Sequence, residues 1–522
     1  MKMVKSLMLG SAAGLLVMGG AQAADLPLKA KAVEYVKVCS LYGAGYWYIP
    51  GSDTCIYIGG AIRLDVAFNG ATYDAPYWQN SQSASANASQ AYGRNYFQER
   101  ARFNLTEDTR TATEYGVLRT YANLQMDWID GGNSAIAGGN PVEVDYAFIQ
   151  FAGFTMGKAV SEYDPQWALT KPTISSGFFN GSNDATGISQ LAYTATFGNG
   201  VSATISLEDA QPYRTAGVVN TSTTTLNGLI QSTPASGGYG VGNFTGNAVA
   251  GDHVPDVVGN LRLDQAWGTL HFAAAAHEVH GTYYGNGTTI PMVSDNGHPS
   301  STWGFAATGA IEIKNLPTGA GDSFKAEAGY AHGAAKYVFG GTIDTSGAGR
   351  FFRTSGTQGG TVAFGYVLDG IYTGTSAANG TNISLSDAWE VSAFYEHYWN
   401  PQWRTSLFGN YSAITYGAGS GSALLAALNN GGGFGTLATN GNANFATAQV
   451  GTKTSWQPVK NLTFSAEFLY SRLIPSTTGT LTTTAVSATG STGAVSGASP
   501  GQIYTIGAQN VFNGAVQVIR SF

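Results

Sequence analysis

The side chains best suited to metal or acid–base chemistry in this sequence of 522 residues are its seven histidines. They include one dense group, His271, His277 and His280. On an extended strand His271 and His277 share one face but stand about 20 Å apart, at ~3.3 Å per residue. That separation is too large for one metal ion. We therefore interpret these histidines as solvated side chains near a strand end, and we expect no metal site.

Catalytic constellations have no better support in the sequence. Serines are so abundant that pairing one with a histidine to form a triad discriminates nothing. The glycine-rich stretch at 237–242 is followed by no lysine and no evident helix, both of which a phosphate-binding loop needs. We interpret this stretch as an external loop, and we predict that the protein is not an enzyme and has no cofactor.

The N-terminus has the pattern of an export signal. Lys2 and Lys5 precede an apolar stretch at 7–18, and small residues at 21–23 supply a signal-peptidase site. We predict that residues 1–23 are a signal peptide cleaved after Ala23. Loss of its two lysines takes the formal net charge from −7 to −9, so nucleic acid is not expected as a partner.

Two cysteines, Cys39 and Cys55, remain after this cleavage. In an oxidising compartment an even count favours a disulfide. The bridge would close a loop of about 16 residues and contribute roughly 3 kcal/mol through loop entropy. A two-cysteine metal site is the alternative, although no histidine lies nearby in the sequence.

The composition limits the elements that can hold these residues. Only 11% of the residues are charged, and 71 are glycine, against typical shares of ~25% and ~7%. Such a chain has too little charge for the surface of a soluble α/β enzyme, and glycine is costly in long helices. A bundle of membrane helices is excluded, because each helix needs about 20 consecutive apolar residues. The remaining class is all-β.

Period-two alternation is the dominant pattern after Cys55. In residues 56–69 the apolar side chains, such as Ile62 and Leu64, share one face, and the charged ones share the other. The hairpin at 191–208 repeats this pattern around a Gly-Asn-Gly turn. Segments of about 10 residues suit tilted strands that cross a bilayer. The pattern recurs at 100–106, 116–128, 257–264, 270–276, 303–313, 324–330, 389–395, 404–411, 446–454 and 462–470.

Short and long connections alternate between these segments. A further short turn at Ala152-Gly153 divides 146–158 into two strands, and the C-terminal strand from Phe512 brings the total to sixteen. The short links are 107–114, 198–200, 265–268, 315–322, 400–401 and 457–461, and the eight long ones are 70–95, 129–140, 161–186, 210–255, 281–301, 336–386, 414–443 and 473–501. This asymmetry predicts a 16-stranded antiparallel transmembrane β-barrel over 56–522, with short periplasmic turns and long external loops. Residues 24–55 would form a periplasmic segment closed by the disulfide.

Aromatic residues agree with this interpretation. Six tryptophans fall at or near strand ends, where membrane-interface girdles are expected: Trp128, Trp267, Trp303, Trp399, Trp403 and Trp456. The alternative is that they are simply aromatic residues in β structure. The last residue, Phe522, follows Val516 and Val518 at period two and resembles an outer-membrane assembly signal, although Arg520 breaks the apolar parity.

Short motifs near the N-terminus and in the first third of the chain carry a family resemblance. They are ADLP at 24–27, VKVC at 36–39 with LYGAG at 41–45, IPG at 49–51 with DTCI at 53–56, and VEVDYAFIQFAGF at 142–154. They resemble the alphaproteobacterial general porin family. The resemblance implies a homotrimer of barrels in the Gram-negative outer membrane, each barrel with a water-filled pore narrowed by an inward-folded third loop. It also implies passive diffusion of small hydrophilic solutes and ions without catalysis, with outer-membrane lipid, lipopolysaccharide and the barrel-assembly machinery as partners.

Charged residues of the polar face are candidates for a pore constriction. The basic wall comprises Arg63, Arg100, Arg102 and Arg119, and the acidic candidates on the third loop are Glu162, Asp164 and Asp184. Opposed charges across a narrow opening create a transverse field that orients dipolar solutes. The alternative is that the arginines pair locally with Asp65, Glu99 or Asp127.

Three other functions remain open at this stage. An outer-membrane barrel enzyme of the lipase or protease type shares the architecture, but no Ser/His or acidic/His site at the rim is identifiable. A substrate-specific sugar channel needs an aromatic track, and Tyr121 and Phe408 are too few. An adhesin built as a solenoid requires a fixed repeat period, which the irregular loops do not show.

Overall fold

The structure is a computed structural model that describes most of the chain. The described residues are 37–68, 97–129, 142–174, 180–181, 186–209, 216–222, 248–251, 253–287, 289–340, 350–355 (backbone only), 360–417, 419–430, 436–482, 501 and 503–522. The predicted signal peptide at 1–23 and the glycine-rich stretch at 237–242 lie outside these residues.

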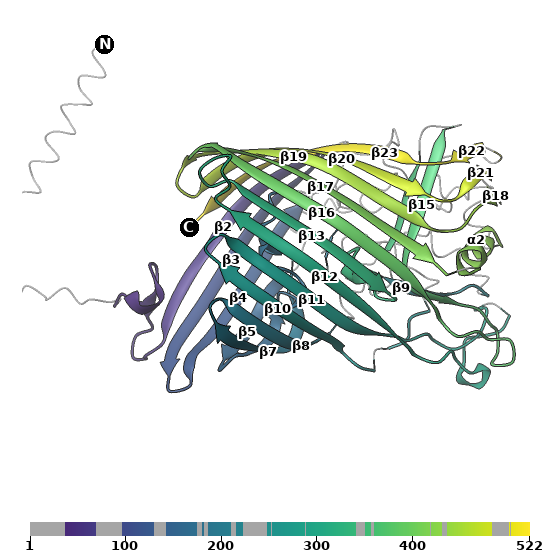
Figure 1. Ribbon diagram of the computed structural model, residues 1–522, viewed down its shortest axis with the longest axis horizontal. Helices are drawn as coiled ribbons and strands as arrows, with labels where there is room; N and C mark the ends of the chain where they lie inside the picture. The colour runs from purple at the N-terminus through teal and green to yellow at the C-terminus, as the bar shows by residue number, and fades with distance from the viewer. Residues whose placement is uncertain are drawn as a thin grey trace, which may run out of the picture.

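Sixteen strands of the described residues close into one antiparallel barrel (Figure 1). They are β2 (Cys55–Phe68), β3 (Phe97–Thr113), β4 (Gly116–Ile129), β5 (Glu143–Phe151), β6 (Phe154–Ala159), β7 (Ile188–Gly198), β8 (Val201–Glu208), β10 (Asp256–Gln265), β11 (Gly268–Val279), β12 (Thr302–Lys314), β13 (Ser323–His332), β16 (Ser384–Asn400), β17 (Trp403–Tyr416), β19 (Phe445–Val459), β20 (Leu462–Pro475) and β23 (Gln509–Ser521). Each pairs with the next, and β23 closes the ring by pairing with both β20 and β2. The predicted 16-stranded antiparallel barrel is confirmed.

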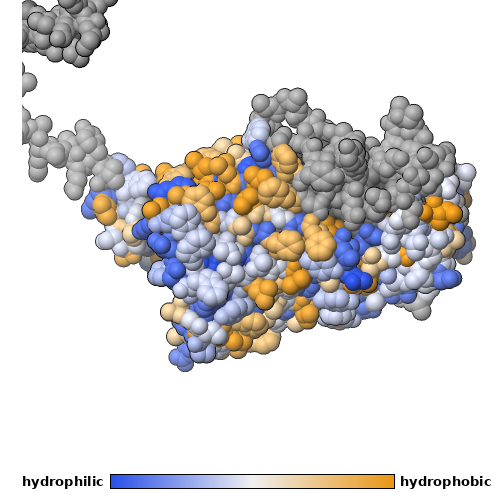
Figure 2. Space-filling view, turned by 90° about the horizontal axis from the view of Figure 1, so that it is seen from above, coloured by the Kyte–Doolittle hydropathy of each residue, from blue (hydrophilic) through white to orange (hydrophobic). Residues whose placement is uncertain are grey.

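The alternation of side chains separates an apolar outer face from a polar lumen. On β2, Ile62 and Leu64 are about half exposed, whereas Asp65 beside them is buried. Figure 2 shows hydrophobic side chains spread over the visible outer face. The six tryptophans are all exposed, and Trp403 stacks on Trp456 with ring centroids 5.7 Å apart. Outward-facing aromatic rings near strand ends are the arrangement of a membrane-interface girdle.

The short turns gather at the end of the barrel that also holds the C-terminus (Figure 1). Ala152 and Gly153 both have positive φ and form the predicted turn between β5 and β6. The predicted link at 107–114 is too long, because β3 continues to Thr113. Its last residues lose the apolar alternation, yet they still pair with β2 and β4, so the ladder extends beyond the patterned region.

The turn between β12 and β13 is organised by one carboxylate. Asp322 is fully buried and accepts hydrogen bonds from the Thr318 hydroxyl and the backbone N–H of Tyr398. His397 Nδ1 lies 2.7 Å from the same group, and the Tyr395 hydroxyl also donates to it. Burial acts to raise the pKa of Asp322, but these hydrogen bonds outweigh it and hold the pKa below its usual range.

The long loops at the opposite end carry structure that the sequence pattern did not reveal. Figure 1 labels most of its elements, including β15, β22 and α2, at the end away from the C-terminus. They are β9 (Gly217–Asn220), β14 (Arg350–Ser355), β15 (Thr361–Tyr372), β18 (Thr436–Asn440), β21 (Thr478–Thr482), β22 (Ile503–Ile506) and α2 (Ser420–Asn430). Among the described residues, no helix has the length and apolarity required to cross a membrane.

Strand β15 crosses this end of the barrel and builds an apolar core there. Its first residues pair with β22, and its last residues pair with β9 and the start of β16. Phe364 and Leu368 of β15 are buried in one cluster with lumen-facing alanines such as Ala273 and Ala306. Small side chains at these wall positions leave the space that β15 fills.

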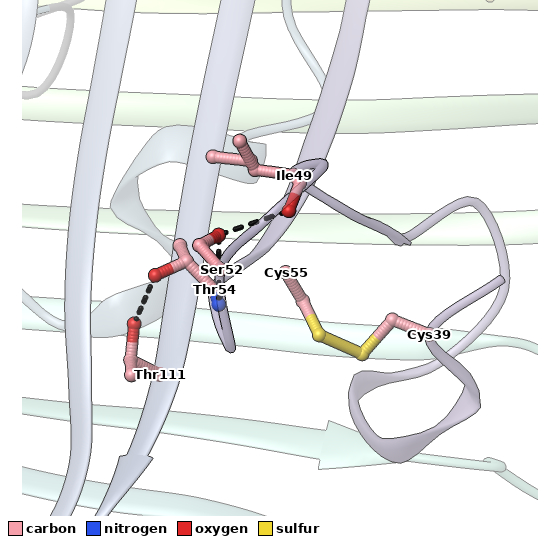
Figure 3. Close-up of a disulfide and its surroundings, with 6 residues drawn as sticks. All are labelled: Cys39, Ile49, Ser52, Thr54, Cys55 and Thr111. Atoms are coloured by element: carbon pink, nitrogen blue, oxygen red, sulfur yellow. Dashed lines mark hydrogen bonds between the residues drawn. A yellow bond between two sulfur atoms is a disulfide. The ribbon is translucent and has the colours of Figure 1, made fainter. Parts of the chain in front are cut away.

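The N-terminal segment docks on the start of β2. The strand β1 (Trp47–Tyr48) pairs with β2, and a 3-10 helix, η1 (Ser40–Tyr42), precedes it. Cys39 and Cys55 form a disulfide at a sequence separation of 16, and both are buried (Figure 3). Thr54 bonds to Thr111 of β3 at 2.8 Å, which ties the segment to the extended β3 (Figure 3). The predicted disulfide is confirmed, and the two-cysteine metal site is wrong.

Candidate pore constriction

Three of the four predicted arginines lie together on the lumen wall. Arg63 on β2 is in register with Arg102 on β3, and Arg100 is in register with Asp65. On the next strand, β4, Asp127 is in register with Arg102. The row therefore follows from strand register, which sets lumen-facing residues of neighbouring strands side by side.

The guanidinium groups of this row pair with two carboxylates. Arg63 and Arg100 both contact Asp65 at 2.8 Å, and Arg102 contacts Asp127 at 2.8 Å. Three arginines thus meet two aspartates, which leaves the row with one excess positive charge. Local pairing with Asp65 and Asp127 is part of the geometry, while the third suggested partner, Glu99, lies on the opposite parity of β3 and is exposed.

Arg119 lies apart from this row. Arg119 is in register with Arg110 of β3. Arg110 is eight residues from Arg102 on the same strand, and at ~3.3 Å per residue this places Arg119 about 26 Å from the row. Its carboxylate partner is Asp108, at 2.9 Å. The structure does not bring Arg119 together with the other three arginines, because lumen-facing parity sets the direction of a side chain and not its level in the barrel.

The third loop, which joins β6 to β7, runs along the inside of the barrel. Its backbone carbonyl groups at Tyr163, Thr170 and Pro172 meet His271 of β11, Lys325 of β13 and Ser406 of β17. Further along, the N–H of Ile174 donates to Glu467 of β20. The described part of the loop therefore lies against the wall from β11 round to β20.

The acidic candidates of this loop occupy the same side. Glu162 accepts a hydrogen bond from Asn260 of β10, at 2.9 Å, and burial raises the pKa of Glu162. Asp164 is buried within the loop. β10 lies half-way round the strand order from β2 and β23, so Glu162 is attached to the wall that faces the arginine row. Asp184 lies outside the described residues.

A cavity of about 390 Å³ opens between the start of this loop and the wall from β4 to β11. Both Glu162 and Asp164 line it, together with Arg262 and His271. Threonines of β7 and β8 complete much of the lining. Charged and hydroxyl side chains around an open space suit hydrated solutes.

Sequence reasoning missed the side chains that hold the third loop. From the sequence, Lys325 and Glu327 are recognisable only as charged residues of the inward parity. The Lys325 ammonium donates to the loop carbonyl of Thr170, and Glu327 accepts a hydrogen bond from Asn180. Inward parity was the available signal, but the partner of each group is more than 100 residues away and could not be assigned.

The histidines also differ from expectation, since His271 and His277 are buried and not solvated. His277 lies 2.7 Å from Asp256, and the same carboxylate meets the Lys336 ammonium at 3.0 Å. Lys336 belongs to a 3-10 helix, η6 (Ala335–Tyr337), just after β13. The loop strand β15 covers this charged group, because it brings Asp369 to 3.5 Å from His277.

Comparisons with known proteins agree with this architecture. The chain is 33% identical over 286 residues to porin Omp2b of Brucella suis biovar 1, and 32% identical over 289 residues to porin Omp2b of Brucella canis. Each match covers 53% of this chain and 66% of the relative, just under two thirds of its length.

A solved structure shows the same fold. The outer membrane channel DcaP of Acinetobacter baumannii superimposes with a TM-score of 0.53 at 12% identity, over 91% of this chain and 99% of that one. A model of the porin subfamily matches residues 25–498. A closed barrel with an apolar outer face places the chain in the Gram-negative outer membrane, which its strands cross many times. The chain belongs to the porin subfamily.

Proposed function

We propose that the protein is a passive, non-catalytic channel for small hydrophilic solutes and ions, with its constriction between the arginine row of Arg63, Arg100 and Arg102 and the third loop. The observation that carries the proposal is the position of this row inside a closed polar lumen, opposite the wall to which Glu162 is bound. Charges of opposite sign on the two sides would orient dipolar solutes and disfavour apolar ones. Arg119, the fourth arginine that the sequence suggested, is left out of the constriction because it lies at a different height along the barrel wall.

The selectivity of the pore tests this proposal. Replacement Arg100→Gln with Arg102→Gln changes the formal charge of the row from +1 to −1. One charge about 6 Å from a permeating ion contributes about 0.7 kcal/mol in a water-like medium, or roughly threefold in local ion concentration. For the two charges, we therefore expect the local cation concentration to rise about tenfold and the local anion concentration to fall about tenfold, so the cation-to-anion permeability ratio should increase by up to about a hundredfold. Reversal potentials of the purified protein in planar bilayers measure the shift.

A matched control is available in the same strands. Arg119→Gln also removes an arginine from an ion pair with an aspartate, but about 26 Å away along the barrel wall. We expect its permeability ratio to stay near that of the wild type. Equal selectivity of the double variant and the wild type, with both barrels folded, would refute the constriction.

We also propose a homotrimer, on the basis of the family resemblance. Small outward-facing residues on neighbouring strands, such as Ala274 and Ala307, allow close contact between barrels. Channel closure in steps of three within one insertion event is the expected result, and single-step closure would contradict it. Contacts with outer-membrane lipid and lipopolysaccharide, and assembly directed by Phe522, remain predictions.

A further inference from the structure

Two histidines and one glutamate meet at the external end of β10 and β11. His253 lies three residues before β10, Glu278 is the penultimate residue of β11, and His280 directly follows β11. The two strands are antiparallel with Val257 opposite Ala276, so continuing the register brings 253 opposite 280. One ligand atom from each of the three side chains lies within 4.8 Å of the others.

The carboxylate of this group is buried without full compensation. The Glu278 side chain is only 10% exposed, and its Oε2 has no hydrogen-bond partner. Its Oε1 lies 3.9 Å from His253 Nδ1. Burying a carboxylate oxygen without a hydrogen-bond partner is energetically unfavourable, because its hydrogen bonds to water are lost and no protein hydrogen bond replaces them. A cation bound between the three side chains would supply the missing interaction.

The two imidazole rings that would share such a cation lie next to each other. Their centroids are 4.0 Å apart, and His280 Nδ1 lies 2.7 Å from the Ser301 hydroxyl, which orients the ring. Hydrogen bonds of this kind commonly fix metal-binding histidines. Ligand atoms around a tetrahedral ion with bonds of ~2.05 Å stand about 3.3 Å apart, so the group must contract slightly. His253 is able to make this adjustment because its side chain is 60% exposed.

We propose that His253, Glu278 and His280 bind one divalent transition-metal ion of the Zn²⁺ class. Two imidazole nitrogens and one carboxylate oxygen are a ligand set that Zn²⁺ favours, with a further position left for water. Mg²⁺ and Ca²⁺ prefer ligands made entirely of oxygen, so they should bind this group poorly. The bound ion would fasten the end of the loop before β10 to the end of β11, on the outer rim of the barrel.

The test uses the purified full-length protein, folded in detergent. Zn²⁺ affinity is measured by competition with a metallochromic indicator, and Co²⁺ is added separately to report coordination through its visible absorption. The wild type is expected to bind one equivalent of Zn²⁺ and to give a Co²⁺ band. His253→Ala and Glu278→Gln should each weaken Zn²⁺ binding at least tenfold and abolish the band.

The control variant is His298→Ala, since His298 is exposed on the loop that follows His280 and is not part of the group. It should bind Zn²⁺ as the wild type does. His253 lies at the surface, so His253→Ala should fold even where Glu278→Gln does not, and heat-modifiable gel mobility checks this. Undiminished Zn²⁺ binding by His253→Ala would overturn the site. So would the absence of a stoichiometric Co²⁺ band in the wild type, or displacement of Zn²⁺ by equimolar Mg²⁺.

Discussion

Removal of the disulfide should loosen the N-terminal segment and leave the barrel intact. The perturbation is the double replacement Cys39→Ala with Cys55→Ala, which avoids placing a hydroxyl at two buried positions. The bridge closes a loop with a sequence separation of 16 residues. Loop-closure entropy for that length is about 10 cal/mol/K, which corresponds to about 3 kcal/mol at 25 °C. The opening equilibrium of the segment should therefore rise about 150-fold.

Hydrogen exchange measures this opening at named amides. The N–H of Tyr48 donates to Lys37 and that of Cys39 donates to Tyr46, and both hydrogen bonds depend on the segment staying docked. Their protection factors should fall by about two orders of magnitude in the variant, whereas amides in the middle of β16 should be unchanged. Wild-type protein treated with a reductant should match the variant. Unchanged protection of Tyr48 would refute the reasoning, because the remaining contacts, including Thr54 with Thr111, would then suffice.

Three further predictions concern turns and buried charge. In Gly200→Ala the new Cβ would lie 1.9 Å from a backbone oxygen of β10, so its thermal unfolding should occur well below that of Gly198→Ala, which has similar positive φ but open space around it. The pKa of Asp322 is lower in the folded state than in the unfolded state. Its contribution to the free energy of unfolding is therefore complete above about pH 3.9, the pKa of an unfolded aspartate, and is lost as the pH falls from there through the folded-state pKa. Asp322→Asn should therefore unfold more readily at neutral pH and show a flatter loss of stability in acid titrations followed by circular dichroism. Asp256→Asn leaves the buried Lys336 ammonium without its carboxylate partner, which should destabilise the fold by about 3–5 kcal/mol. The gel mobility shift on heating should then occur at a lower temperature than in the wild type. An unchanged temperature would show that this ion pair does not stabilise the barrel.

The outcome for the histidines shows why site prediction from sequence alone was incomplete. The sequence pattern predicted that His271 and His277 are solvated side chains on one strand face, but the third loop and β15 supply partners that bury them. His280 was grouped with them, although its partners in space are His253 and Glu278. A period-two pattern assigns a face to each residue but does not say which loop will cover it.

The sequence by itself determined the barrel. One face of each strand contacts an apolar medium and the other contacts water, so apolar and polar side chains alternate with a period of two in every strand. It also determined the disulfide, since an exported chain with two cysteines has one possible pair. Only the tertiary structure decided the levels of Arg100 and Arg119, which depend on strand register, and the course of β15 across the lumen. Register and loop packing are set by contacts between residues far apart in the chain, and these leave no periodic signal in either partner.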